Sequence, residues 1–254
     1  MAIDLQTQRI NLGQEIQADP GIGDTLSVLI SELRAANAQR VLDIGCGDGT
    51  IVAEMAAAGF QMTGLDPSDN SITRARQKVP EAQFLCSTIE DLPDDLPLFD
   101  AAYFVNSLHH VELSQMPSAI RRAIRAVKPD GIVVVIEPMA QGSFFRAMRP
   151  VEDETQIRSN AINTLQSLIS DGHIALQGIR RWNRENRFAD LEDFVDYLTR
   201  AAPERGEIAR RNAAALARAW RDNIRSVDGM ALLLQPLIGW IITAPDAALR
   251  SPRP

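Results

Sequence analysis

The sequence at positions 40–50 reads RVLDIGCGDGT, and this stretch decides the fold. A short apolar run that contains one acid, Asp43, leads into glycines at alternate positions, Gly45, Gly47 and Gly49. The residues that follow return to an apolar pattern of good helix formers. Strand, glycine turn and helix in this order open a βαβ unit. Because alternate glycines permit positive φ and carry no Cβ, a ligand can lie against the backbone at the start of the helix.

The glycine spacing narrows the class of ligand. A dinucleotide fingerprint would read G-x-G-x-x-G, and Thr50 stands where its third glycine belongs. A phosphate loop would need a lysine followed by serine or threonine, which the stretch lacks. The carboxylate of Asp43 would repel a pyrophosphate, but it suits a cationic group. An NAD-dependent oxidoreductase and a non-catalytic nucleotide-cofactor-binding protein on the same general fold remain the alternatives.

The stretch resembles motif I of the class I S-adenosylmethionine-dependent methyltransferases. In that family the glycine loop passes under the methionine part of the cofactor, and the acid helps to hold its ammonium group. The resemblance extends over roughly 38–138. It implies an α/β fold with a doubly wound, seven-stranded, mostly parallel sheet. It also implies S-adenosylmethionine as methyl donor and S-adenosylhomocysteine as product.

A second acid, Asp66, ends the next predicted strand, 60–66. An acid about 20 residues past a glycine loop, at the carboxyl end of a strand, is placed to accept both ribose hydroxyls of a nucleoside. A turn acid before Pro67 is the plainer explanation. The resemblance implies further cofactor contacts, which follow the glycine turn and the second to fourth strands: Cys46, Pro67, Thr88, Ile89, Glu90, Asn106 and Ser107.

The adenine end of the cofactor is the least regular part of the resemblance. The family commonly has an acid or another polar side chain just after the third strand, here 83–86, and it reaches the adenine amino group. By alignment that place falls on Thr88, so recognition would use Thr88, Glu90 or the backbone of Ile89. A solvated loop is the alternative.

Two of the three histidines, His109 and His110, follow the predicted fourth strand, 99–106. Since an unperturbed imidazole titrates near neutral pH, either would serve as a general base. Helix capping or loop hydrogen bonds are the structural alternatives. Glu137 ends the predicted fifth strand, where it would contact substrate or a backbone amide. Adjacent histidines without a nearby carboxylate cluster predict no metal site.

Composition limits the partners. The chain has 254 residues, 45% of them hydrophobic, which suits one domain with a full core. A net charge of −7 argues against a broad basic surface for nucleic acid. Neither Cys46 nor Cys86 has a metal or disulfide-exchange spacing, so we expect reduced thiols in a cytoplasmic protein. No signal pattern begins the chain, and the apolar run 230–244 is too broken and short to cross a bilayer.

The remaining sequence predicts a cap. We expect one domain over 1–254, with the core at about 25–138 plus C-terminal strands, an N-terminal flap at 1–24 and a helical cap at about 139–228. Within and after the cap we expect helices at 153–170, 191–200 and 204–225, and strands at 174–179, 230–234 and 237–242. The alanine- and arginine-rich helix 204–225 would also offer a face for a homodimer.

The acceptor pocket should lie between the ends of strands four and five and this cap. We expect it to be bounded by His109, Glu137, Arg146 and Arg149. The arginines that follow the fifth strand hint at an anionic small molecule, but a solvated face with surface ion pairs is the favoured explanation. The Asn-Pro-Pro-Tyr type of tetrad found in many nucleic-acid and protein methylases is absent after strand four. This favours a small-molecule acceptor.

Overall fold

The computed structural model describes residues 20–245, so the flap expected at 1–24 lies largely outside the described residues. One sheet organises the chain, in the order β3-β2-β1-β4-β5-β8-β6, with β7 paired to β8. The strands are β1 (Arg40–Ile44), β2 (Gln61–Asp66), β3 (Gln83–Cys86), β4 (Phe99–Val105), β5 (Val127–Pro138), β6 (Ala175–Phe188), β7 (Arg225–Val227) and β8 (Met230–Thr243). The helices are α1 (Thr25–Ala35), α2 (Thr50–Ala57), α3 (Asp69–Lys78), the 3-10 turn η2 (Leu108–His110), α4 (Met116–Ala126), α5 (Ser143–Met148), α6 (Thr155–Ser170), α7 (Leu191–Ala201), α8 (Glu204–Arg211) and α9 (Ala213–Asn223).

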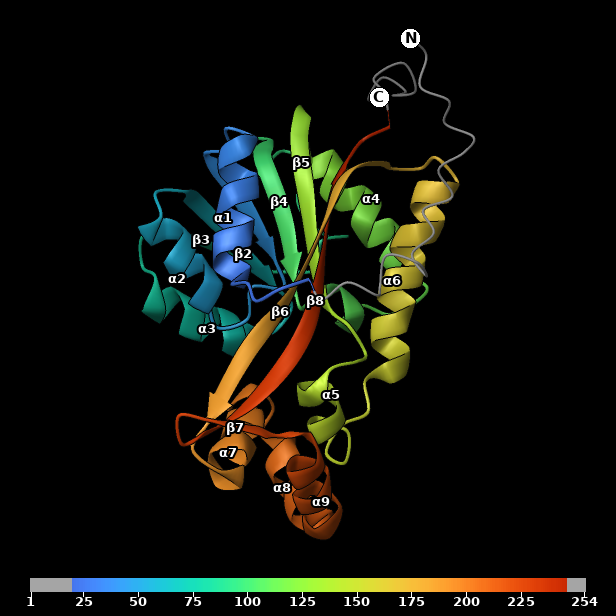
Figure 1. Cartoon of the computed structure of the whole chain (residues 1–254). Helices are drawn as coiled ribbons and strands as arrows, with labels where there is room; N and C mark the ends of the chain where they lie inside the picture. The colour runs from blue at the N-terminus through green and yellow to red at the C-terminus, as the bar shows by residue number, and fades with distance from the viewer. Residues whose placement is uncertain (1–19, 246–254) are drawn as a thin grey trace.

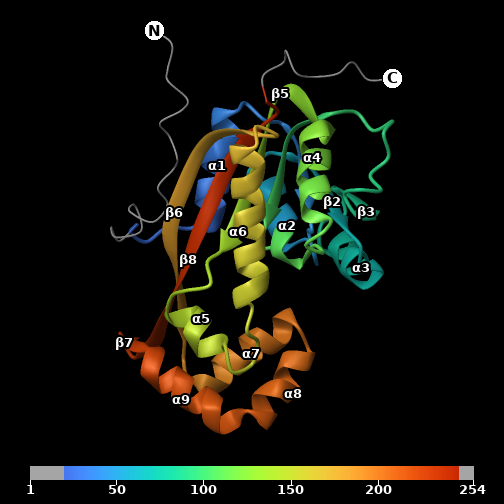
Figure 2. The same cartoon turned by 90° about the vertical axis from the view of Figure 1, so that its right-hand side faces the viewer.

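Helices cover both faces of the sheet (Figures 1 and 2). Strands β1 to β5 are mutually parallel, whereas β8 runs antiparallel to both β5 and β6. One apolar cluster packs α1, α2 and α3 on one face, and a second packs α4 and α6 on the other. The predicted doubly wound, mostly parallel sheet is therefore confirmed. The run Val133–Glu137 of β5 is buried throughout, as expected for a central strand covered on both faces.

Beyond the end of β5, β6 and β8 continue without it as a long two-stranded ribbon. The pairing of β5 with β8 ends at Pro138 and Leu237, whereas β6 stays paired with β8 as far as Phe188. Helices α5, α7, α8 and α9 gather at the far end of this ribbon (Figure 1). We call the segments 143–148 and 191–227 the cap lobe. Its core is a cluster of mutually contacting rings: Phe144, Phe188, Phe194, Tyr197 and Trp220.

The elements within 139–228 differ from the sequence prediction, and α6 in this range packs on the sheet rather than in the cap lobe. The single helix expected at 204–225 is two helices that meet at Asn212, whose side-chain amide donates to the Pro150 carbonyl oxygen at 2.7 Å. The polar stretch after 179 continues β6 rather than ending it. Asp228 and Gly229, with φ of 52° and 77°, make the tight hairpin turn that creates the unexpected strand β7.

Candidate cofactor and active site

The three glycines between β1 and α2 have different structural roles. All three have positive φ, at 81°, 54° and 77° for Gly45, Gly47 and Gly49. A Cβ on Gly45 would lie 2.5 Å from Cβ of Ser107, and one on Gly49 would lie 3.0 Å from Cβ of Ala75. A Cβ on Gly47 would meet no atom within 4 Å. Two of the glycines therefore serve packing within the protein, and Gly47 is the one that borders open space.

Asp66 ties the glycine loop to the end of β2. Its Oδ2 accepts a hydrogen bond from the Gly47 amide at 3.0 Å, and its Oδ1 accepts from the Ser68 amide at 2.9 Å. Pro67 between them is exposed. A carboxylate offers about four lone-pair sites, so Asp66 retains capacity for ligand hydroxyls beside these two bonds. Asp66 is thus both the turn acid and a candidate for ribose.

Asp43 lies beneath the loop rather than on its surface. It is 2% exposed, and the hydroxyl of Tyr103 on β4 donates to its Oδ2 at 3.0 Å. Burial raises the pKa of Asp43 from its usual value to about 7; the Tyr103 bond opposes this shift, and the charge of Asp66 adds to it. Asp43 can therefore act on a cationic ligand through its charge, and such a ligand would favour its ionised form.

Cys46 and Ser107 turn their side chains into the protein. A Cβ on Gly64 would come within 2.8 Å of the Cys46 sulfur, so this side chain packs onto β2. Burial raises the pKa of the Cys46 thiol, which keeps it protonated and unreactive. The Ser107 hydroxyl donates to the Ile44 carbonyl at 2.6 Å and so fixes the loop after β4 against the end of β1. The backbone of both residues, not the side chains, is what a cofactor would meet.

Two buried oxygen atoms beside this edge of the sheet have no hydrogen-bond partner among the described residues. They are Oε1 of Glu90, in the loop after β3, and Oδ1 of Asn106, at the end of β4. Asn106 also has a φ of 54°, which is uncommon for a residue with a side chain. Buried acceptors without donors are costly, and a ligand with N–H or O–H groups would satisfy them.

The other residues predicted to contact adenine have side chains that are hydrogen-bonded or buried within the protein. The Thr88 hydroxyl donates to an Asp91 carboxylate oxygen at 2.9 Å, and the Ile89 side chain is buried at 3% exposure. Of the side chains predicted for the adenine amino group, only that of Glu90 has a buried acceptor without a partner.

His109 and Glu137 form a buried pair. Nδ1 of His109 contacts Oε2 of Glu137, and the Leu108 amide donates to Oε1 of the same carboxylate at 2.9 Å. His109 is 4% exposed and Glu137 is fully buried. A carboxylate that accepts from Nδ1–H leaves Nε2 of the neutral ring as the unprotonated nitrogen. The structure therefore joins two of the predicted catalytic residues, and it gives Glu137 a backbone amide as well.

Glu154, at the start of α6, comes close to this pair from a different part of the chain. Its carboxylate is bonded to Arg158, at 2.7 Å from Nε, and to Arg205, at 3.1 Å from Nη2. Burial alone would raise the pKa of Glu154, but the charge and hydrogen bonds of Arg158, with the charges of His109 and Arg205, hold it below its usual value. Glu154 was not among the site residues predicted from the sequence. The i, i+4 spacing of Glu154 and Arg158 on a helix was the available signal.

Glu154 also lies near both adjacent histidines, for which the sequence predicted no metal site. Candidate ligand atoms of His109, His110 and Glu154 lie within 4.8 Å of one another, so adjacency in sequence does not by itself exclude a metal site. Two guanidinium groups already occupy the Glu154 carboxylate, and their charge opposes a divalent cation. Partial burial and the neighbouring His109 lower the pKa of His110, and the two rings lie 4.1 Å apart.

Arg146 and Arg149, predicted for the substrate, do not join this group. Both are exposed. Arg146 donates to the side chain of Asn223 at 2.7 Å, and Arg149 forms an i, i+4 ion pair with Asp153 at 2.8 Å. They match the surface-contact alternative, and Arg146 joins α5 to the end of α9. Phe144, Phe145 and Trp220 likewise lie in the buried core of that lobe.

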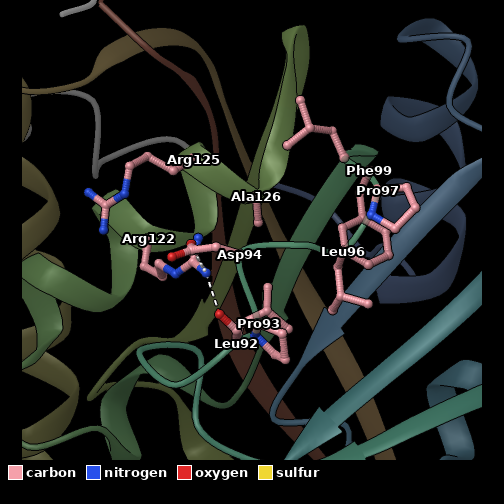
Figure 3. A pocket seen from close by; sticks show the side chains of 10 residues that line it. Leu92, Pro93, Asp94, Leu96, Pro97, Phe99, Arg122, Arg125 and Ala126 are labelled. Atoms are coloured by element: carbon pink, nitrogen blue, oxygen red, sulfur yellow. Dashed lines mark hydrogen bonds and ion pairs between the residues drawn. The ribbon is translucent and has the colours of Figure 1, made fainter. Parts of the chain in front are cut away.

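Two surface cavities lie away from the glycine loop. One, in Figure 3, has a volume of about 20 Å³, and it is lined by Leu92, Phe99, Arg122 and neighbouring residues. That volume holds about one water molecule. The second has about 400 Å³ and lies between Arg40, Phe60 and Gln83, at the amino ends of the strands. Ligands of open α/β sheets bind at the opposite, carboxyl edge, where the paired and orphaned groups described above converge.

No helix within residues 20–245 combines the length and hydrophobicity needed to cross a bilayer.

Residues 41–131 match the sequence profile of a family described as a methyltransferase domain. An uncharacterized methyltransferase of Synechocystis sp. is 32% identical over 108 residues, which are 42% of this chain and 51% of that protein. A ubiquinone biosynthesis O-methyltransferase of Alkalilimnicola ehrlichii is 37% identical over 101 residues, which are 38% of this chain and 40% of that protein. The chain thus spans about half the length of these curated relatives, or less.

The fold extends further than the sequence likeness. The crystal structure of the YcgJ protein of Bacillus subtilis aligns with a TM-score of 0.62 at 20% identity, over 87% of this chain and 98% of that chain. At this level of identity the likeness concerns the fold, which includes the region after residue 131.

Proposed function

This chain belongs to the class I S-adenosylmethionine-dependent methyltransferases, and from this premise we propose that it transfers a methyl group to a small-molecule acceptor. The glycine loop carries the proposal. It lies inside the matched segment 41–131, at the carboxyl edge of the sheet, with Gly47 facing open space.

The residues at this edge suit each part of the cofactor. Asp66 has capacity for the ribose hydroxyls, and the orphaned Oε1 of Glu90 would accept from the adenine amino group. The orphaned Oδ1 of Asn106 would accept from the ammonium group, which the buried charge of Asp43 also favours. S-adenosylmethionine supplies a methyl group already activated by a positive sulfur. The protein then has to align the acceptor with that methyl group and exclude water.

A base is needed only where the acceptor atom still carries its proton when it attacks. His109 fits this role, because Glu137 holds the Nδ1 side of its ring and leaves Nε2 to take the proton. Glu137 acts through His109 and is a positioning residue. His110, beside it, would line the approach of the acceptor.

The acceptor is proposed to be small and anionic. Arg158, which is buried, and Arg205 both bind the Glu154 carboxylate near His109, and β6 carries further arginines. Relatives named ubiquinone biosynthesis O-methyltransferases make an oxygen acceptor the first to try. Cys46 and Cys86 are both free thiols, which fits a reducing compartment such as the cytoplasm.

Calorimetry separates the proposal from its alternatives. S-adenosylmethionine and S-adenosylhomocysteine should bind with micromolar affinity, and NAD should not bind. The bound protein should then release S-adenosylhomocysteine when a suitable phenol or hydroxy acid is added. Binding of NAD without binding of S-adenosylmethionine would refute the proposal. Binding of S-adenosylmethionine without turnover on a broad panel of acceptors would favour the non-catalytic alternative.

A further inference from the structure

Arg184 occupies a distinctive place on β6. It pairs with Gln235 of β8, two positions beyond Leu237, where the pairing of β8 with β5 ends. It therefore lies just past the carboxyl edge of β5, at the base of the two-stranded ribbon that carries the cap lobe. Because residues two apart on a strand share a face, Arg184 lies on the side of Trp182, which packs with Ile136 and Leu237.

The guanidinium of Arg184 lacks a partner. Its Nε is buried without an acceptor, and within residues 20–245 the side chain forms no hydrogen bond or ion pair. Two other arginines on β6 form ion pairs: Arg180 with Glu32 at 2.7 Å, and Arg187 with Glu185 at 3.0 Å. A buried N–H donor without an acceptor is costly, so the retention of Arg184 needs a reason outside the protein's own contacts.

The acids near Arg184 are already committed. Burial lowers the pKa of Arg158, and the positive charge of Arg184 lowers it further, which places the two guanidinium groups within electrostatic reach of each other. Arg158 donates hydrogen bonds to the Glu154 carboxylate, the Met139 carbonyl oxygen and the Gln235 side-chain oxygen. Glu137 holds His109 and the Leu108 amide. Neither carboxylate is therefore left to pair with Arg184, and an external anion can take that place.

We propose that Arg184 receives an anionic oxygen group, a carboxylate or a phosphate, carried by the methyl acceptor. This rests on the proposed function, since it assigns Arg184 to the acceptor side of the same edge. The guanidinium fork matches either anion with two parallel hydrogen bonds, which would fix the acceptor's orientation as well as its affinity. The side chain is half-buried, so an acceptor can reach it.

Matched probes test the assignment. The protein, saturated with S-adenosylhomocysteine, is titrated at constant ionic strength with benzoate, with inorganic phosphate and with neutral benzamide, and its unfolding temperature is followed. We expect benzoate or phosphate to raise the unfolding temperature and benzamide to have no effect. In Arg184→Gln the apparent affinity for the anion should fall about tenfold or more. Arg187→Gln, three residues along the same strand, should keep the wild-type response.

The outcomes are distinguishable. Failure of the wild type to bind S-adenosylhomocysteine would refute the proposed function itself. Normal binding of S-adenosylhomocysteine with an equal response to benzoate and benzamide, or with no response to either anion, would refute the role of Arg184 alone. An anion response that persists in Arg184→Gln would place the anion elsewhere. Arg184→Gln without probes should be about as stable as the wild type, because within residues 20–245 the Arg184 side chain has no hydrogen bond or ion pair to lose.

Discussion

Nδ1 of His109 and Oε2 of Glu137 are in direct contact, and this pair joins the turn after β4 to the last residues of β5. Strand β4, which leads into this turn, and β5 are adjacent and parallel, so their carboxyl ends meet at one edge. Burial of the pair excludes water from the contact, so the carboxylate fixes both the orientation and the tautomer of the ring.

Replacing Glu137 by Gln should lower turnover without changing cofactor affinity. A glutamine still accepts from the Leu108 amide, but its NH₂ group would face Nδ1 and force the proton onto Nε2 of His109. The base would then be lost, and kcat should fall about 10²-fold or more. S-adenosylhomocysteine release and calorimetry measure the two quantities. His173→Gln, at the exposed third histidine, is the control. Equal kcat in Glu137→Gln and the wild type would remove His109 from the proton path.

Gly47 and Gly172 allow a matched comparison. Both have positive φ, at 54° and 71°, and neither has an atom within 4 Å of where a Cβ would lie. Valine at either position costs similar backbone strain. We expect Gly47→Val to abolish binding of S-adenosylmethionine in calorimetry, because its side chain fills the space of the ligand. Gly172→Val, in the turn after α6, should bind normally. Normal cofactor binding by a folded Gly47→Val would show that the loop does not border the cofactor.

Replacing Asp66 by Ala should weaken S-adenosylmethionine about tenfold to a few hundredfold, since hydrogen bonds to a charged group contribute about 1.5–3 kcal/mol each. The change also removes the acceptor of the Gly47 amide, so part of the loss will come from the loop. Asp69→Ala, in the first turn of α3, is the control for charge. The measurement is the dissociation constant of S-adenosylmethionine for the wild type, Asp66→Ala and Asp69→Ala. Identical values for the three proteins would refute the role of Asp66.

Asp43 should make stability depend on pH. Its pKa in the folded protein, about 7, is above its usual value of 3.8. A carboxyl group whose pKa is raised on folding contributes most below the unfolded pKa, and this contribution is lost as pH rises through 7. Urea unfolding at pH 5 and pH 8 should show a larger loss of stability for the wild type than for Asp43→Asn. The opposite order, or parallel behaviour of the two proteins, would contradict the buried, partly protonated state of Asp43.

The sequence was sufficient for the sheet and the cofactor loop because their signals are local. Strand, glycine turn and helix follow one another within the stretch 40–57, and Asp66 ends the very next strand. Ser68 and Asp190 also cap their helices by local contacts, each by accepting a backbone N–H three residues ahead.

The features that were not predicted from the sequence have physical explanations. Strand β6 continues through a polar run because it pairs with β8 along its whole length, and this pairing is tertiary. The helix break at Asn212 depends on a bond to Pro150, far away in the sequence. The turn at Asp228 and Gly229 was a local signal that could have been read. Glu154 reaches His109 only through folding, and the partnerless state of Arg184 becomes visible only when its neighbours are known.

A crystal structure with S-adenosylhomocysteine tests the central claim most directly. We predict electron density along the carboxyl edge of the sheet, against Gly47, with the ribose hydroxyls at Asp66 and the adenine amino group at Glu90. Density elsewhere, for example in the cavity between Arg40, Phe60 and Gln83 at the amino edge, with the glycine loop bare, would contradict the account.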